Sequence, residues 1–197
     1  MNKMLITLAI IITLILFLIF YFGIEYKIFK LKSEVKNIKS SVESILNYEL
    51  NENLFVQKNF NFVNKYTKNK ILSIRILKTV YKFAKLYDLD PDLILCLIAI
   101  ESNFKPNAIS RKNAVGLTQI LPETGEIISK MLGRFFYDLY DIEDNIEFCC
   151  AYLYHLKKFS NNDEKIMLQK YYAGRYFEQK EAIKYAQKII KLYRELK

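Results

Sequence analysis

The amino-acid sequence predicts a mainly α-helical protein, and three observations favour this fold class. Only five Gly and three Pro occur among the 197 residues, whereas sheets joined by many turns consume both residue types. Residues 4–24 form a run without charge that is rich in Ile, Leu and Phe. After residue 70, apolar residues recur at the three- and four-residue spacing of amphipathic helices. The same composition excludes collagen-like chains and disordered chains rich in Pro and Gly.

The chain is basic, with 30 Lys and Arg against 21 Asp and Glu, which gives a formal net charge of +9. The basic residues are spread along the whole chain, and no basic block dominates. Proteins that bind nucleic acid usually concentrate their positive charge in a patch or a tail. Nucleic acid is therefore not an expected partner.

The apolar run is long enough to cross a membrane as a helix, which takes about 20 residues. It begins after Lys3, and its end at residues 20–24 has neither a small-residue cleavage motif nor a lipobox cysteine. Secretory signals usually have a shorter apolar core followed by such a motif. We therefore expect residues 1–24 to form an uncleaved transmembrane anchor.

The lysines on the two sides of this run bear on its orientation. Lys3 precedes the run, whereas Lys27, Lys30, Lys32 and two further lysines follow it within 15 residues of its end. The positive-inside rule, taken alone, would place the C-terminal part of the chain in the cytoplasm.

A heptad pattern follows the apolar run without a helix-breaking residue. Its apolar positions alternate in steps of four and three residues and are Ile24, Ile28, Leu31, Val35, Ile38, Val42 and Ile45. Such a seam is typical of a coiled coil. It predicts either a helical stalk that self-associates or a single amphipathic helix laid against its own domain. Residues 47–70 are polar and rich in Asn and Lys, so residues 25–69 are expected to form a stalk and a linker.

A helical domain is expected from residue 70 to residue 197. A first amphipathic helix covers about residues 71–87, and Asp90 and Pro91 then supply a cap and a first-turn proline for the next helix. That helix is apolar nearly all round and closes with Glu101, so it should lie at the centre of the domain. A carboxyl group at this place is expected to be partly desolvated, with a raised pKa that lets it donate a proton near neutrality.

The cysteines do not form a recognisable framework. Cys96, Cys149 and Cys150 are odd in number, lie in apolar helical surroundings and show no CxxC or Cys/His ligand spacing. We expect three buried, reduced thiols. His155 is the one histidine and is expected to be an ordinary helix residue. The sequence therefore predicts no metal site and no cofactor.

Four ordered motifs resemble the soluble lytic transglycosylase family. The first is E-S-x-F-x-P-x-A, which begins at Glu101 and is followed by a serine, Ser110, nine positions after Glu101. A G-L-x-Q motif places Gln119 eighteen positions after Glu101, and P-x-T follows it at residues 122–124. Further on, N-I with Y-L at residues 145–153 and Y-Y-A-G at residues 171–174 are similar to the remaining family patterns. The resemblance covers nearly everything after residue 70.

The resemblance implies a lysozyme-like, mainly helical domain that cleaves the β-1,4 bond between MurNAc and GlcNAc in peptidoglycan. Glu101 would be the single catalytic acid and base. Most glycosidases need a second carboxylate, and none lies in the matched motifs near Glu101. The family is thought to use the substrate's own N-acetyl group and its C6 hydroxyl instead, which gives a 1,6-anhydro product.

The resemblance also implies the substrate-binding residues. Ser110 and Gln119 would line the cleft and hydrogen-bond the N-acetyl group and the acid, and Tyr171 would position the acid or the acetamido group. Gly116 is expected to permit a close backbone approach, and Leu117 and Thr118 belong to the same cleft segment. Two other motif residues have structural expectations: Asn145 caps a helix or pins the fold, and Phe104 belongs to the core.

Three residues depart from the family pattern. Thr118 stands where the family usually has Met, Cys149 where it has Gly, and Tyr172 where it has Asn. Thr118 is expected to change the shape and polarity of the cleft wall, and Tyr172 puts a ring where an amide would hydrogen-bond. None of the three removes the acid.

The resemblance and the apolar run together imply a transglycosylase anchored in the bacterial cytoplasmic membrane by a single span, with its domain facing the periplasm or cell wall. Because peptidoglycan lies outside that membrane, this orientation takes precedence over the count of lysines. The expected partners are peptidoglycan strands, the membrane and, through residues 24–45, a second copy of the chain. The alternatives are a hydrolytic muramidase similar to goose-type lysozymes and a catalytically silent wall-binding scaffold.

Overall fold

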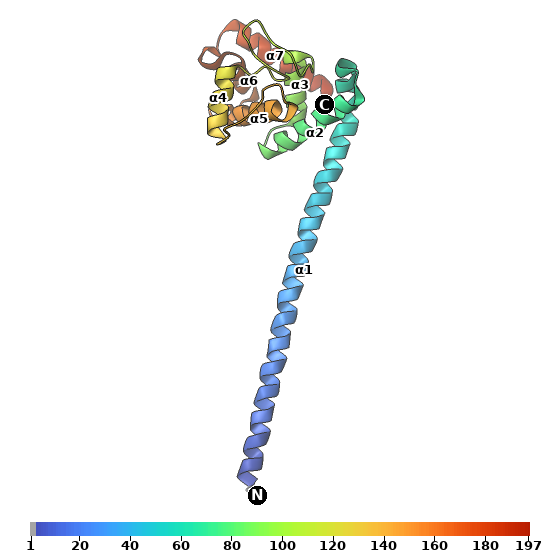
Figure 1. The fold of residues 1–197 in the computed structure, drawn as a ribbon, viewed down its shortest axis with the longest axis vertical. Helices are drawn as coiled ribbons and strands as arrows, with labels where there is room; N and C mark the ends of the chain where they lie inside the picture. Colours follow the sequence, from blue (N-terminus) through green and yellow to red (C-terminus); the bar gives the residue numbers. More distant parts are fainter. Residues whose placement is uncertain (1–2) are drawn as a thin grey trace. The chain divides into compact units, whose positions relative to one another are not determined.

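The computed structural model describes residues 3–197, and that part of the chain is helical and contains no strand (Figure 1). The prediction of a mainly α-helical protein is confirmed. The elements are α1 (Lys3–Thr67), α2 (Lys70–Leu86), α3 (Pro91–Ser102), α4 (Pro122–Met131), α5 (Ile142–Lys158), α6 (Glu164–Ala173), the short 3-10 helix η1 (Gly174–Tyr176) and α7 (Lys180–Leu196). The irregular segment between α3 and α4 has two isolated bridges, Ile109 to Val115 and Val115 to Ile120.

The chain divides into two compact units, Met1–Asn51 and Glu52–Lys197. The described part of the first unit is helix α1, whose most apolar 18-residue window has a mean hydropathy of 2.7 and no buried residue. This helix is long and apolar enough to cross a membrane, by length and composition. It continues through the heptad positions without interruption, so the predicted helix over residues 24–45 is present.

The seam of the heptad pattern lies exposed along α1. The exposed fractions of its side chains range from 40% for Ile28 to 64% for Ile38. Apolar side chains in a continuous stripe remain in contact with water unless another surface covers them.

The segment expected to be a linker differs in the structure. Residues 52–67 continue helix α1 and belong to the second unit. Phe55 and Val63 are 9% and 0% exposed, and the rings of Phe62 and Tyr66 contact the buried ring of Phe104 at centroid distances of 5.8 and 5.4 Å. The segment has an apolar face with helical spacing, which the many Asn and Lys residues made hard to recognise in the sequence. Phe104 is a core residue, as predicted.

A polar contact also joins this last part of α1 to the start of α3. The carboxylate of Asp92 accepts a hydrogen bond of 2.9 Å from Asn59 Nδ2 and forms an ion pair with Lys58 Nζ at 2.7 Å. Asp92 and Asn59 are both buried. Buried polar groups need such partners, because an unpaired one loses its bonds to water without replacement. Residues 52–67 are therefore part of the domain.

Helix α3 is the central helix of the domain, as predicted. Its residues from Pro91 to Ala99 are buried, and it packs against α2 and α7. Asp90 caps it by accepting a hydrogen bond of 2.8 Å from the backbone N–H of Asp92, and Pro91 occupies the first turn. The helix ends at Asn103, whose φ of 51° and bond to the carbonyl of Ala99 stop it directly after Glu101 and Ser102.

We expect Val63→Asp to destabilise the domain by at least about 3 kcal/mol, because a carboxylate would replace a fully buried apolar side chain. Near-UV circular dichroism of the tyrosines during urea denaturation would measure the effect. The matched control is Val42→Asp, since Val42 is 49% exposed in the first unit. Equal stability of the two variants would show that residues 52–67 do not pack in the domain.

Candidate active site

Glu101 lies in the last turn of α3 and is half-buried. The neighbouring residue fixes this end of the helix, because the hydroxyl of Ser102 donates a hydrogen bond of 2.7 Å to the carbonyl of Leu117. This bond ties the first motif to the G-L-x-Q segment. The carboxyl group thus lies at the end of a helix, and the next residue, Ser102, is held by the G-L-x-Q segment.

Two opposing effects set the protonation of Glu101. Burial raises the pKa of its carboxyl group to about 7, because the charged form loses its water. The hydroxyl of Tyr185, on α7, donates a hydrogen bond to Oε1 and partly offsets this rise in pKa. A carboxyl group with a pKa near neutrality can hold a proton and release it in the same range of pH. The expectation of a raised pKa from the sequence agrees with this result.

Glu101 opens into a cleft with a volume of about 770 Å³. Three other residues that the sequence singled out line the same cleft: Ser110, Gln119 and Tyr171. They come from the loop after α3 and from α6, so the fold gathers residues that lie up to 70 positions apart. The rest of the lining consists of Arg111, Lys112, Ala114, Ile120, Leu121, Thr124, Tyr152, Tyr172, Ala173, Gly174, Tyr176, Gln179 and Glu181.

Ser110 and Gln119 each use part of their polar groups to hold the loop. Ser110 Oγ accepts hydrogen bonds of 3.2 and 3.0 Å from the backbone N–H groups of Lys112 and Ala114. Gln119 Nε2 donates to the carbonyls of Ala108 and Gly116 at 3.1 and 2.9 Å. The hydroxyl hydrogen of Ser110 and the carbonyl oxygen of Gln119 therefore remain the groups with which these residues could address a ligand.

The tyrosine that contacts Glu101 is not the one that the resemblance implied. Tyr171 donates its hydroxyl to the backbone carbonyl of Thr118 at 2.8 Å. Tyr185, which sequence reasoning missed, is the tyrosine that bonds to Glu101. Tyr185 is 7% exposed and shares the buried face of α7 with Ala182, Ala186 and Ile189. Its spacing marks it as a core residue, and nothing in the local pattern links it to an acid 84 positions earlier.

Three residues expected in the cleft lie behind its wall. Gly116 is buried, and Leu117 and Thr118 are 1% and 0% exposed. Gly116 has a φ of +80°, and a Cβ atom there would lie 2.2 Å from Asn145 Nδ2 and 2.5 Å from the carbonyl oxygen of Leu139. The expected close approach at Gly116 is confirmed, but it brings the backbone against Asn145. The side chains of Leu117 and Thr118 face the core because the turn after Gly116 directs them inward.

Asn145 pins the fold, as predicted. Its Nδ2 donates to the carbonyls of Val115 and Leu139 at 3.0 and 2.8 Å. Its Oδ1 accepts from the backbone N–H and the hydroxyl of Thr118 at 2.9 and 2.8 Å. Thr118 is therefore a partner of Asn145, and the expectation that it alters the polarity of the cleft wall does not match the structure.

The other two departures from the family pattern also have clear positions. Cys149 is fully buried beside Tyr171 and Thr118, and burial raises the pKa of its thiol to about 12, so the thiol is neutral. All three cysteines are free and buried, as predicted. Tyr172 is 49% exposed in the cleft, and its ring stacks on that of Tyr185 with a centroid distance of 4.7 Å and an interplanar angle of 27°. Tyr172 therefore supports the ring that bonds to Glu101.

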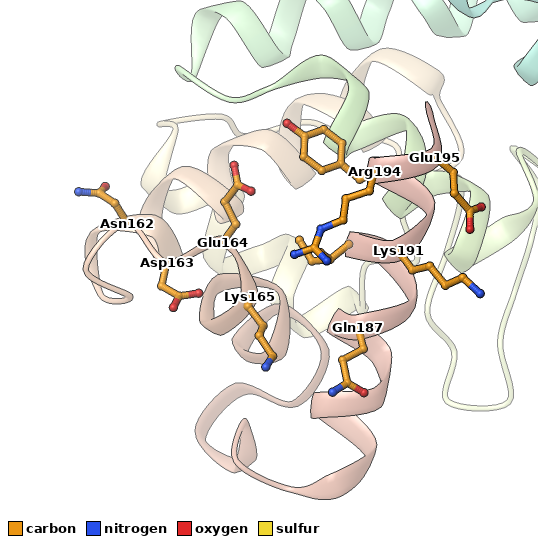
Figure 2. A pocket seen from close by; sticks show the side chains of 10 residues that line it. Asn162, Asp163, Glu164, Lys165, Gln187, Lys191, Arg194 and Glu195 are labelled. Atoms are coloured by element: carbon orange, nitrogen blue, oxygen red, sulfur yellow. The ribbon is translucent and has the colours of Figure 1, made fainter. Parts of the chain in front are cut away.

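A second hollow, of about 830 Å³, lies between the start of α6 and the end of α7 (Figure 2). Its lining mixes acidic and basic side chains, and it contains no residue of the four motifs. Asp163, one of its carboxylates, caps α6 by accepting from the backbone N–H of Ile166 at 3.0 Å. The cleft at Glu101 is smaller, but it holds the carboxyl group with the raised pKa and is the stronger candidate for a site.

The cleft with the Glu101 carboxyl at its wall is the candidate active site, and comparison with known proteins identifies the family. Residues 78–193 match the family described as Transglycosylase SLT domain. The match covers more than half of the chain. The chain belongs to the transglycosylase SLT domain family.

Relatives of known name are similar over part of this chain. The membrane-bound lytic murein transglycosylase C of Mannheimia succiniciproducens is 39% identical over 88 residues, which is 42% of this chain and 25% of that protein. The protein of the same name from Photorhabdus laumondii is 42% identical over 72 residues, covering 34% of this chain and 20% of the relative. The chain thus matches about a quarter of the length of these relatives.

Solved structures share the fold. The 70 kDa soluble lytic transglycosylase of Escherichia coli superposes with a TM-score of 0.57 at 17% identity, covering 74% of this chain and 30% of that one. An inactive mutant of the lytic transglycosylase Slt from Pseudomonas aeruginosa gives a TM-score of 0.56 at 21% identity, covering 70% and 27%. At this level of identity the likeness concerns the fold.

We expect Glu101→Gln to stabilise the domain at pH 8 by about 2 to 3 kcal/mol and to change little at pH 4. The carboxyl group has a pKa of about 7 in the folded chain and 4.5 as a model group. Between pH 4.5 and pH 7 the Glu101 carboxyl is ionised in the unfolded chain but still protonated in the folded chain, so the free energy of unfolding falls as pH rises. Above pH 7 the folded chain bears the full cost of a buried carboxylate. Glutamine removes that cost. Urea denaturation at both pH values measures it, with Glu178→Gln, an exposed carboxyl, as the control that should gain at neither pH.

We expect Tyr185→Phe to raise the pKa of Glu101 above about 7, because the lost hydroxyl stabilises the ionised carboxylate. The pKa can be followed by NMR of chain carrying ¹³C-labelled glutamate. Tyr193→Phe is the control, since Tyr193 lies on the same helix and donates to Asp90 at 2.7 Å. An unchanged or lowered pKa in Tyr185→Phe would contradict the assigned hydrogen bond.

Proposed function

We propose that this chain is a membrane-anchored lytic transglycosylase that cleaves the β-1,4 bond between MurNAc and GlcNAc in peptidoglycan. The observation that carries the proposal is the Glu101 carboxyl, whose pKa is raised to about 7 at the wall of the cleft. The membership of the chain in the SLT domain family supports the choice of substrate. The names of the relatives, membrane-bound lytic murein transglycosylases, point to the same reaction.

In the first step Glu101 acts as the acid. The bond between C1 of MurNAc and the bridging oxygen breaks, and the proton of Glu101 goes to that oxygen, which leaves on the GlcNAc side. Positive charge develops at C1, and the substrate's own N-acetyl carbonyl can stabilise it without a protein nucleophile. The hydroxyl of Ser110 and the amide oxygen of Gln119 would orient that N-acetyl group, because both residues line the cleft with one polar function unused.

In the second step Glu101 acts as the base. The ionised carboxylate accepts the proton of the MurNAc C6 hydroxyl while that oxygen bonds to C1, which gives the 1,6-anhydro end and restores the acid. No water is consumed and no group is oxidised. Tyr185 donates its hydrogen bond to the carboxylate between the two steps, which lowers the cost of the ionised form in a half-buried place.

Hydrolysis is the second candidate reaction, and one residue favours it. Glu181, on α7, is exposed and lines the same cleft as Glu101. A second carboxylate could activate a water molecule, as in glycosidases that use two carboxyl groups. The two reactions differ by one water in the mass of the product.

The anchor and the orientation belong to the same proposal. The apolar start of α1 would span the cytoplasmic membrane once, because its length and hydropathy suit a single crossing. The domain would then face the periplasm or cell wall, where the substrate lies. The net charge of +9 would add a mild attraction to an anionic envelope.

We expect the full chain, purified in detergent, to release muropeptides with 1,6-anhydro ends from sacculi, detected by mass spectrometry. Glu101→Gln should lower the rate at least about 1,000-fold, because one group supplies both proton transfers. Glu181→Gln should leave the anhydro mass in place. Products heavier by one water that disappear in Glu181→Gln would establish hydrolysis, and binding to sacculi without any release would establish a scaffold.

The exposed seam of α1 supports a further part of the proposal, self-association in parallel. We expect Val35→Cys to form a disulfide-linked dimer under mild oxidation in detergent, because Val35 lies in the seam and the native cysteines are buried. Ser40→Cys, off the seam on the same helix, should not crosslink. The readout is the dimer band on non-reducing gels, and equal bands for both variants would argue against pairing by the seam.

A further inference from the structure

The loop that joins α4 to α5 (Figure 1) exposes two adjacent phenylalanines. Phe135 and Phe136 are 92% and 90% exposed, so almost all of each side chain is in contact with water. Ile127 and Met131 are also exposed and lie one turn apart on the same side of α4, the helix that leads into this loop. In the described part of the chain, other residues line the cleft at Glu101. Glycan binding in that cleft therefore does not account for these four side chains.

Contacts with α5 hold the loop on both sides of the phenylalanine pair. Before the pair, the guanidinium of Arg134 forms ion pairs of 2.5 Å with Asp144 and 2.6 Å with Glu147. After the pair, the backbone N–H of Asp138 donates to Asp144 Oδ2 at 2.8 Å. A fixed loop therefore displays the two rings, and little backbone freedom would be lost when a partner covers them. Exposed apolar groups that gather in one place are typical of interaction surfaces.

The segment around the pair is acidic, although the chain as a whole is basic. Residues 122–147 contain seven Asp and Glu against two Lys and Arg, a formal charge of −5, whereas the whole chain carries +9. Glu123, Glu126 and Asp138 are exposed and have no cationic partner within the part of the chain that the structure describes. Lys130 is the exposed cation of this segment. The apolar side chains thus lie among unpaired negative charges.

These charges restrict the kinds of partner that the surface fits. An anionic lipid surface or an anionic wall polymer would be repelled by the unpaired carboxylates. A second copy placed symmetrically on the same surface would bring like charges together. A protein segment with apolar side chains flanked by Lys or Arg would cover the rings and neutralise the carboxylates. The ridge of Ile127 and Met131 along α4 favours a helix as that segment, because helices pack ridge into groove.

We propose that residues 127–138 form a docking surface for a cationic amphipathic helix of a partner protein. The apolar side of that helix covers Phe135 and Phe136, and its Lys or Arg side chains lie near Glu126 and Asp138. Aromatic side chains at the centre of an interface supply much of its affinity, and charges at the rim add selectivity. This inference is independent of the proposed function, because the docking surface lies outside the cleft.

The test selects helical peptides displayed on phage for binding to the full chain in phosphatidylcholine nanodiscs. Peptides that also bind the double variant Phe135→Ser/Phe136→Ser are removed first. We expect the enriched peptides to carry a net positive charge and apolar residues at helical spacing. Their affinity, measured by fluorescence anisotropy, should fall at least about tenfold in the double variant. Enriched peptides without positive charge, or no peptide that distinguishes the double variant, would overturn the inference.

Two further variants separate the contributions of the rings and the charges. Glu126→Gln/Asp138→Asn should weaken binding of the selected peptides and reduce its dependence on salt, because it removes the charges that salt screens. The matched control is Phe159→Ser, since Phe159 is 62% exposed at the end of α5, and it should leave the affinity unchanged. An equal loss of affinity in Phe159→Ser would show general hydrophobic adhesion and contradict a defined docking surface.

A single fluorescent reporter tests the competing explanation, binding of the loop to lipid. The chain contains no Trp, so Phe136→Trp places one indole in the docking surface. In nanodiscs of phosphatidylcholine and phosphatidylglycerol, we expect the emission of an indole in water until a selected peptide is added, when it should shift to shorter wavelength. A shift caused by these nanodiscs before any peptide is added would overturn the partner helix in favour of a lipid surface.

Discussion

The side-chain amide of Asn145 holds together the part of the domain on which the cleft depends. Its four hydrogen-bonding positions are filled by Val115, Leu139 and Thr118. It is 1% exposed, where an unfilled position would be costly. The amide can approach the loop this closely only because Gly116 has no Cβ atom. The loop so fixed carries Ser110 and Gln119 to the cleft.

The second constraint is the burial of α3. Because the helix is surrounded by α2 and α7, its last turn carries Glu101 into a place with little water, and the pKa of the carboxyl rises. Tyr185 then keeps this rise within the range in which both protonation states are accessible. Helix α3 thus provides both the position and the raised pKa that the proposed chemistry requires, and Tyr185 on α7 partly offsets the rise in pKa.

The residues that depart from the family pattern are coupled to these two constraints. Thr118 contributes a hydroxyl to Asn145, and Cys149 fills a buried place beside Tyr171. Tyr172 stacks on the ring of Tyr185, and the hydroxyl of Tyr185 donates a hydrogen bond to Glu101. Each replacement meets a neighbour that accommodates it, which explains how the domain keeps its geometry with altered motifs. Of the three, Tyr172 also has an exposed face in the cleft.

The sequence by itself determined the helical class, the apolar start of α1, the central helix that ends at Glu101, and the ordered motifs, because these depend on spacing along the chain. It did not reveal Tyr185 or Glu181, because both lie on α7 and reach the cleft only after α7 packs against α3. It assigned residues 52–67 to a linker or loosely packed segment, since their buried face is sparse and becomes clear only against Phe104. Tertiary structure decided which residues of each motif face the cleft: Leu117 and Thr118 are buried, whereas the next residue, Gln119, lines the cleft.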